Sequence, residues 1–133
     1  MDVVSEYSEA PPAEAGRVKI VGPIYALDRV QRLAEDPERI LMWTLKSQRD
    51  IEVLFESDTE ELARVVRTLA PQHYRNSEWC TDGRNRIAAC DAYCLDRKET
   101  TAAGSTIQVQ YFLKFAIDVE GMLLLLVSCH LSN

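Results

Sequence analysis

The hydrophobic pattern of the chain changes at Pro71, and this change constrains the fold more than any other feature of the sequence. Within residues 62–69, apolar side chains repeat at i, i+3, i+4 and i+7, which is typical of an amphipathic helix. After Pro71, apolar and polar residues alternate in segments separated by turn residues, which is typical of strands. Helices followed by an antiparallel run of strands predict an α+β fold.

Two helices are expected before Pro71. A short amphipathic helix spans residues 27–34 and is bounded by Pro37. A second begins after Asp58, which is a good N-cap residue and is followed three positions later by Glu61, as in a capping box. Pro71 ends this second helix because proline lacks the backbone N–H that a helix needs.

Two apolar segments remain ambiguous between strand and buried helix, because periodicity alone does not separate them: ILMWTL (40–45) and IEVLFE (51–56). Further along, residues 99–105 are expected to form a flexible connection, and residues 118–121 a hairpin turn with Gly121 at positive φ. The expected strands after Pro71 are 73–79, 86–95, 107–117 and 122–131.

The size of the chain, 133 residues, predicts a single domain. Residues 1–16 are acidic and rich in Pro and Ala, so we expect a mobile tail there and one α+β domain over residues 17–133. No apolar run approaches the ~20 residues that a membrane helix needs. The N-terminus also lacks the layout of a secretory signal, so we expect a cytoplasmic protein without a membrane partner.

The net charge of −6 argues against a general nucleic-acid coat protein, because binding to a polyanion depends on Lys and Arg. Residues 71–115 nevertheless hold six basic and five acidic side chains, so the basic groups gather where a site is expected. The four cysteines, at positions 80, 90, 94 and 129, do not have the spacing of a structural zinc site. We therefore expect reduced thiols, no metal and no cofactor.

The segment LAPQHYRNSEWC (69–80) places three side chains suited to phosphate binding next to one another. If this segment is a strand, His73 and Arg75 share one face and Tyr74 points to the core, because side chains alternate along a strand. A guanidinium matches the geometry of phosphate oxygens, so Arg75 is the expected phosphate ligand. A β-bulge would break this alternation.

The order of several short motifs resembles the MqsR family of toxins, the motility quorum-sensing regulators. The resemblance covers residues 23–132 and is carried by PIYALDRVQRLA, LAPQHYRNS, CDAY, YFLKF and LLVSCHLS. It implies helices packed on a curved antiparallel sheet, similar to RelE. It also implies a metal-independent endoribonuclease that cuts single-stranded mRNA, an mRNA interferase, and a cognate antitoxin protein that neutralises it.

Matched residue by residue, Tyr74 and Arg75 take the places of Tyr and Lys in the family's Phe-Tyr-Lys-Ser motif. Asp91 and Tyr93 match the family's Gln-Asp-x-Tyr, and Lys114 matches the lysine of Tyr-Leu-Lys. The sequence departs from the family where Gln, Tyr, Arg and the C-terminal Lys are replaced by Cys90, Phe112, Cys94 and His130. These changes bear on catalysis more than on the fold.

Eight residues are therefore candidates for the site. Those expected to take part in catalysis are Arg75, His130, Lys114 and His73, and those expected to bind RNA are Arg84, Arg86, Tyr93 and Phe112. For each residue there is also an ordinary structural alternative, such as core packing for Phe112 or a near-core position for His130. For the chain as a whole, the alternative function is a catalytically inactive module that binds protein or RNA on the same fold.

Overall fold

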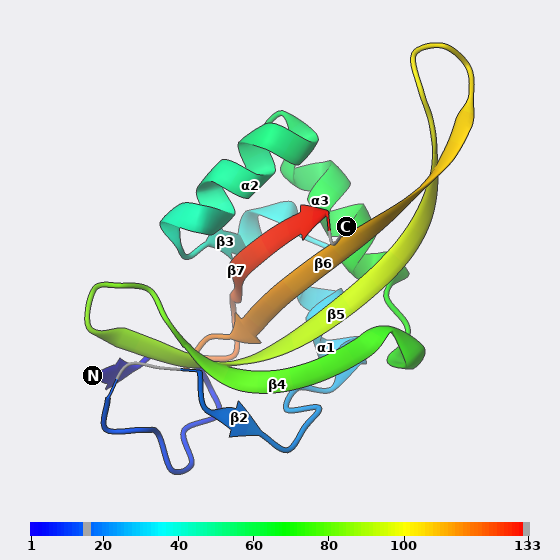
Figure 1. Cartoon of the computed structure of the whole chain (residues 1–133). Helices are drawn as coiled ribbons and strands as arrows, with labels where there is room; N and C mark the ends of the chain where they lie inside the picture. Colours follow the sequence, from blue (N-terminus) through cyan, green and yellow to red (C-terminus); the bar gives the residue numbers. More distant parts are fainter. Residues whose placement is uncertain (15–16, 132–133) are drawn as a thin grey trace.

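A computed structural model describes residues 1–14 and 17–131 and confirms the α+β class. In this part of the chain, three α-helices lie on one side of a strongly curved sheet of seven strands (Figure 1). The helices are α1 (Leu27–Leu33), α2 (Leu45–Phe55) and α3 (Thr59–Thr68). The strands are β1 (Asp2–Val3), β2 (Lys19–Ile20), β3 (Ile40–Met42), β4 (Tyr74–Thr81), β5 (Arg86–Thr100), β6 (Thr106–Ile117) and β7 (Leu124–Leu131).

The four long strands form the predicted antiparallel meander. The order in the sheet is β2-β4-β5-β6-β7-β3, with β1 pairing to β5 in parallel. The turn between β6 and β7 is built as expected: the N–H of Gly121 donates to the carbonyl of Asp118, and Gly121 has a φ of 72°. Strand β3, which lies between α1 and α2 in the chain, adds a parallel edge beside β7 and completes the sheet.

Helix α3 begins where the capping residue predicts, although the full capping box does not form. The Asp58 carboxylate accepts hydrogen bonds from the N–H groups of Glu60 and Glu61. The Glu61 side chain does not return to the cap, because it forms ion pairs with Arg64 and Arg97 instead. The apolar stripe of α3 is fully buried against the sheet.

The helix cap at Thr44 decides the secondary structure of the two segments that periodicity left ambiguous. Residues 40–42 form β3, and Thr44 then caps α2 by accepting from the N–H of Ser47 at 2.9 Å. The Ser47 hydroxyl in turn accepts from the N–H of Thr44 at 3.1 Å. Because the helix starts at this cap, residues 51–55 continue α2 rather than forming a strand.

The mobile tail expected over residues 1–16 is incorrect for its first part. Asp2–Val3 pairs with β5, and Ser5 forms a bridge with Asp118. Glu6 forms an ion pair with Arg29 of α1 at 2.6 Å. These contacts join positions far apart in the sequence, so composition did not reveal them. Residues 15 and 16 lie outside the described part of the chain.

The long strands separate the molecule into a covered face and an open face. On β6, Tyr111, Leu113 and Phe115 point to the covered face, beneath the helices, where Tyr111 stacks on Phe55 of α2 with ring centroids 5.8 Å apart. Side chains of the opposite parity, including Phe112 and Lys114, point to the open face. The open face is turned toward the viewer in Figure 1.

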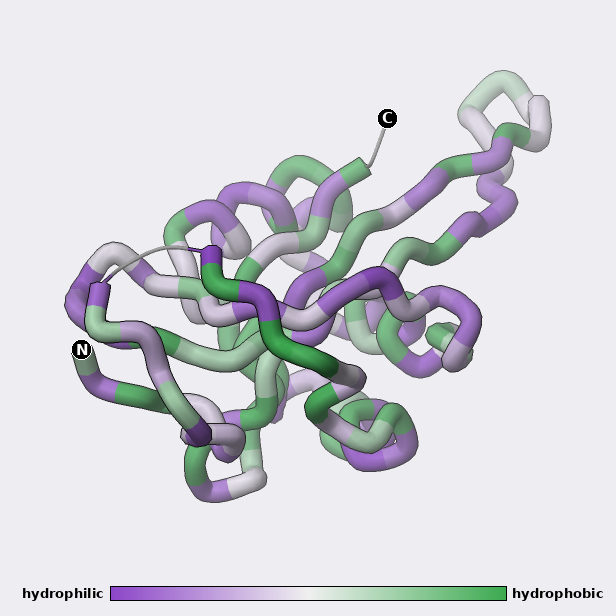
Figure 2. Tube along the Cα trace, turned by 60° about the horizontal axis from the view of Figure 1, so that its bottom comes forward, coloured by the Kyte–Doolittle hydropathy of each residue, from purple (hydrophilic) through white to green (hydrophobic). Residues whose placement is uncertain are grey.

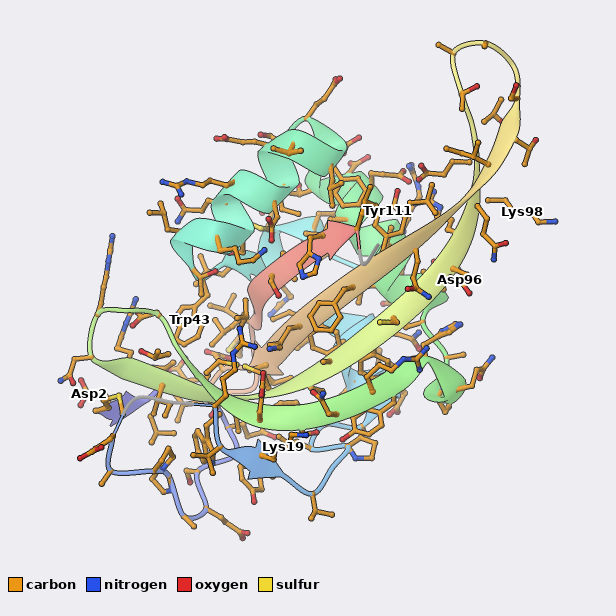
Figure 3. The ribbon with its side chains drawn as sticks, viewed as in Figure 1. Asp2, Lys19, Trp43, Asp96, Lys98 and Tyr111 are labelled. Carbon is orange, nitrogen blue, oxygen red and sulfur yellow. The ribbon has the colours of Figure 1, made fainter. Side chains whose placement is uncertain are left out.

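The hairpin of β5 and β6 continues past the body of the protein as an arm, residues 96–110 (Figure 1). Hydrophilic and hydrophobic residues are mixed along this arm in Figure 2, and Lys98 points away from it into solvent in Figure 3. Glu99 and Thr100 belong to β5, so the connection is shorter than the predicted 99–105. No helix in the described residues is long and apolar enough to cross a membrane.

Candidate functional site

The open face contains a cavity of about 440 Å³, which we call the open-face pocket. It lies over β4, β6 and β7, beside the N-terminus of α2, and Arg17, two residues before β2, also contributes to it. Its lining residues are Arg17, Thr44, Lys46, Trp79, Cys80, Thr81, Phe112, Lys114, Val127, Ser128 and His130. Four of these side chains are basic and none carries a carboxylate.

Small residues on β5 allow two long side chains to meet beneath the pocket. In the sheet register, Glu78 of β4 stands opposite Cys90, and Lys114 of β6 stands opposite Ala92. Because Cys90 and Ala92 are short, Glu78 and Lys114 reach across β5 and form an ion pair. Both residues are only 7% exposed, so the pair is shielded from water.

Phe112 and His130 form an aromatic platform next to this ion pair. They stand opposite each other on β6 and β7, and their rings stack with centroids 5.0 Å apart at an angle of 24°. The Lys114 ammonium lies 5.7 Å from the centroid of the Phe112 ring. The structure therefore brings together three of the eight candidates from the sequence: Phe112, Lys114 and His130.

The tautomer of His130 follows from a hydrogen bond that its ring makes to the backbone of the next residue. Nδ1 lies 2.9 Å from the carbonyl oxygen of Leu131. Since a carbonyl oxygen can only accept, Nδ1 carries the hydrogen, and in the neutral imidazole the lone pair is then on Nε2. A neutral imidazole in this tautomer can take up a proton at Nε2, which is the chemistry of a general base.

Helix α2 is tied to β7 at the edge of the pocket. The register shifts after Lys114, and the carbonyl of Val127 accepts from the Thr44 hydroxyl at 2.5 Å. One turn into the helix, the Asp50 carboxylate accepts from the N–H of Cys129 at 3.0 Å and from Lys46 at 2.8 Å. These bonds hold the Lys46 ammonium beside the pocket.

Arg75 and His73 do not line the open-face pocket, and the strand geometry expected for them is wrong. His73 ends a 3-10 turn (Pro71–His73), where its Nδ1 accepts from the N–H of Ala70 at 2.9 Å. The register of β4 shifts between Tyr74 and Asn76, so Arg75 occupies a bulge and the alternation is broken there. Its guanidinium folds back onto the carbonyls of residues 72–74, at 3.1 to 3.3 Å.

The inward direction predicted for Tyr74 is confirmed, since it packs against the core and meets Tyr93 edge-on with ring centroids 5.7 Å apart. Tyr93, expected to bind RNA, is 2% exposed and stacks on Phe115 of the covered face. Burial raises the pKa of the Tyr93 hydroxyl to about 12. Tyr93 therefore acts as a core residue and does not reach the pocket.

The two loop arginines also lie away from the pocket lining. Arg84 is exposed in the turn between β4 and β5. Arg86 donates to the Asp82 carboxylate at 2.6 Å and stabilises that turn. Sequence reasoning missed three residues, Arg17, Lys46 and Glu78. Glu78 could have been placed on the open face, because it is two residues from Cys80 on the same strand. No local sequence signal points to Arg17 or Lys46.

The pocket is suited to an anionic ligand that also has a flat ring. Arg17 is exposed, whereas Lys46 and Lys114 are balanced in part by Asp50 and Glu78. Among these charged groups Arg17 is in excess, so this face can attract an anion although the net charge of the chain is −6. Among the described residues, no three His, Cys, Asp or Glu side chains are grouped so that they could hold a metal ion.

Comparisons of the chain with protein-family models, with curated proteins and with solved structures found no match. The evidence on function is therefore the geometry of the open-face pocket together with the sequence motifs.

Proposed function

We propose that this protein is a metal-independent endoribonuclease that cuts single-stranded mRNA in the open-face pocket, on a fold of the RelE type. The observation that carries the proposal is the convergence of His130, Phe112, Lys114 and Arg17 in one pocket without a carboxylate in its lining. A general base and cations that stabilise the transition-state charge serve metal-free cleavage of RNA, and an aromatic surface can hold a base in place.

In the proposed reaction, Nε2 of His130 removes the proton from a 2′-hydroxyl, and the oxygen attacks the adjacent phosphorus. The bond to the 5′-oxygen breaks, water supplies the proton to this leaving group, and a 2′,3′-cyclic phosphate remains. Arg17 and Lys46 stabilise the negative charge that builds up on the phosphate oxygens. A base stacks on the platform of Phe112 and His130, as bases do on aromatic side chains in single-strand binding sites.

The resemblance adds a biological setting to this proposal. An mRNA interferase of this kind arrests growth when it is expressed alone, and a cognate antitoxin protein relieves the arrest. We expect expression of the wild-type chain in bacteria to slow growth, and the His130→Ala variant to remove that effect.

A second function is favoured by two observations. The Lys114 charge is neutralised by Glu78, and Arg75, the expected phosphate ligand, is bound to its own backbone. A pocket of this kind can hold a nucleotide without cutting it. The second candidate is therefore a non-catalytic module that binds single-stranded RNA in the same pocket.

One experiment separates the two functions. Labelled single-stranded RNAs of varied sequence are incubated with the purified protein in EDTA, and cleavage is followed on gels while binding is followed by fluorescence anisotropy. We expect His130→Ala to lower the cleavage rate by about 10²–10⁴-fold, the usual contribution of a general base. Arg17→Ala should weaken RNA binding and make it less sensitive to salt.

Arg49→Ala serves as the control, because Arg49 is an exposed cation of α2 that does not line the pocket. Cleavage that persists in His130→Ala would remove the proposed mechanism. Salt-dependent binding without cleavage would select the second candidate. If folded wild-type protein neither binds nor cuts any of the RNAs, both candidates are wrong.

A further inference from the structure

Two cysteines of the open face lie on adjacent strands and are diagonal neighbours. Cys80 of β4 stands opposite Ala88, and Cys90 of β5 stands opposite Glu78, so the two cysteines are offset by two residues in the register. Residues with this relationship point to the same side of the sheet. All four cysteines of the chain are free thiols.

The surroundings of Cys80 and Cys90 differ in a way that assigns each a separate role. Cys80 lines the open-face pocket and is 8% exposed, whereas Cys90 is fully buried beneath the pocket. The Cys90 thiol donates to the carbonyl of Ala88 at 3.4 Å. Its interaction with the Cys80 sulfur, with the nearby charges of Lys114 and Arg17, lowers the pKa of Cys80. Burial raises the pKa of Cys90, which keeps its proton.

The other two cysteines lack this arrangement. Cys94 is half-buried on the open face opposite Phe112. Cys129 is fully buried under α2, where burial and the neighbouring Asp50 carboxylate raise its pKa to about 12. If exposure alone governed reactivity, Cys94 would react before Cys80.

We propose that Cys80 and Cys90 form a peroxide-reactive dithiol, with Cys80 as the attacking thiol and Cys90 as the resolving thiol. The Cys80 thiolate attacks one oxygen of hydrogen peroxide, the O–O bond breaks, and after protonation the products are a Cys80 sulfenic acid and water. The Cys90 sulfur then attacks the oxidised Cys80 sulfur, the S–O bond breaks, and a disulfide and a second water form. Two thiols are oxidised and one peroxide is reduced.

The pocket gives this chemistry both access and a consequence. Peroxide is small enough to reach Cys80 through the open-face pocket. A disulfide would turn the Cys80 side chain from the pocket lining toward Cys90, beside the Glu78–Lys114 pair, so oxidation would reshape the pocket from below. The proposal rests on the two thiols and does not depend on the proposed ribonuclease activity.

The test measures mass and connectivity. The folded, reduced protein is treated with one equivalent of hydrogen peroxide, alkylated under native conditions and then under denaturing conditions, and examined by intact mass spectrometry and peptide mapping. We expect a loss of two hydrogens, two fewer thiols open to alkylation, and a cross-linked peptide joining Cys80 to Cys90. Dithiothreitol should restore all four thiols.

Three variants sharpen the result. Cys90→Ala should stop at the sulfenic acid of Cys80, which dimedone traps; Cys80→Ser should not react; and Cys94→Ser, the matched control, should behave as the wild type does. Circular dichroism checks that each variant is folded. The proposal fails if wild-type protein keeps four free thiols under these conditions, or if the disulfide joins Cys94 or Cys129.

Discussion

The two faces of β6 show how differently one strand is stabilised on its two sides. On the covered face, Leu113 and Phe115 are fully buried against apolar neighbours. On the open face, Lys114 is buried almost as well, but by an ion pair with Glu78 and by the ring of Phe112. Burial on the first face removes apolar surface from water, whereas burial on the second depends on a matched charge.

This difference indicates where the protein can accept a ligand. The covered face is filled by the three helices, so any change there disturbs packing that holds the fold together. The open face contains a pocket above the small side chains of Cys90 and Ala92. Polar side chains line this pocket and can contact a ligand. We therefore expect substitutions on the open face to affect binding first, with the ion pair as the exception.

The largest effect on stability should come from breaking that ion pair. Lys114→Met leaves the Glu78 carboxylate buried without a partner, which should lower the free energy of unfolding by about 3–5 kcal/mol. The double variant Glu78→Leu with Lys114→Met should recover most of this loss. Urea denaturation measures both. Arg32→Ala, which removes an exposed pair with Asp28, is the control and should leave the midpoint nearly unchanged. A stable single variant would show that water reaches Glu78.

The next prediction compares the loss of stability caused by truncating one side chain on each face of β6. Leu113→Ala on the covered face should lower the free energy of unfolding by about 2–5 kcal/mol, because it leaves a cavity in a fully buried layer. Phe112→Ala, the neighbouring residue on the open face, should cost about 1 kcal/mol, as is common outside the core, and should weaken RNA binding. Equal losses of stability would mean that the open face is covered in solution.

A smaller effect is expected at the cap of α3, which covers the sheet. Asp58→Ala removes the acceptor for the N–H groups of Glu60 and Glu61 and should lower the free energy of unfolding by about 1 kcal/mol. Glu52→Ala changes an exposed carboxylate in the middle of α2 and should alter stability by less than about 0.5 kcal/mol. Thermal denaturation of both variants checks the difference.

The smallest predicted effect depends on pH. The hydrogen bond from Arg97 holds the pKa of the Glu61 carboxyl below its usual 4.5, so this carboxylate stabilises the fold above that pH. The contribution is lost as the pH falls through the lower, folded-state pKa. Glu61→Gln should therefore be less stable than wild type at pH 7 by about 1 kcal/mol at most, because both partners are partly exposed. In acid the free energies of unfolding of the two proteins, measured by urea denaturation, should become equal. A difference in stability that stays constant with pH would exclude this ion pair as the cause.

Local signals in the sequence were enough for most elements of the fold. The helical repeat of residues 62–69 and the Asp58 cap predicted α3, and the turn at Gly121 predicted the junction of β6 and β7. Segment 51–56 stayed ambiguous because its helical state is set by the cap at Thr44, which is itself fixed by a bond to Val127. A contact between distant parts of the chain thus determined the secondary structure of this segment.

The candidate site was predictable in part. Phe112, Lys114 and His130 lie where motif order and strand alternation suggested, on facing strands of one sheet. Arg75 was misplaced because a bulge after Tyr74 adds one residue to β4, and alternation cannot reveal such an insertion. Arg17 and Lys46 come from segments with no motif, so only their positions in the folded chain connect them with the pocket.

The sequence by itself determined the class of fold, helices α1 and α3, the four strands after Pro71 and the inward direction of Tyr74, because periodicity, caps and turns act over a few neighbouring residues. The tertiary structure decided which side chains meet. Glu78 and Lys114 are 36 residues apart, and they pair because the register of three strands aligns them over two small residues of β5. Such an alignment arises only when the sheet is assembled, and the open-face pocket is its result.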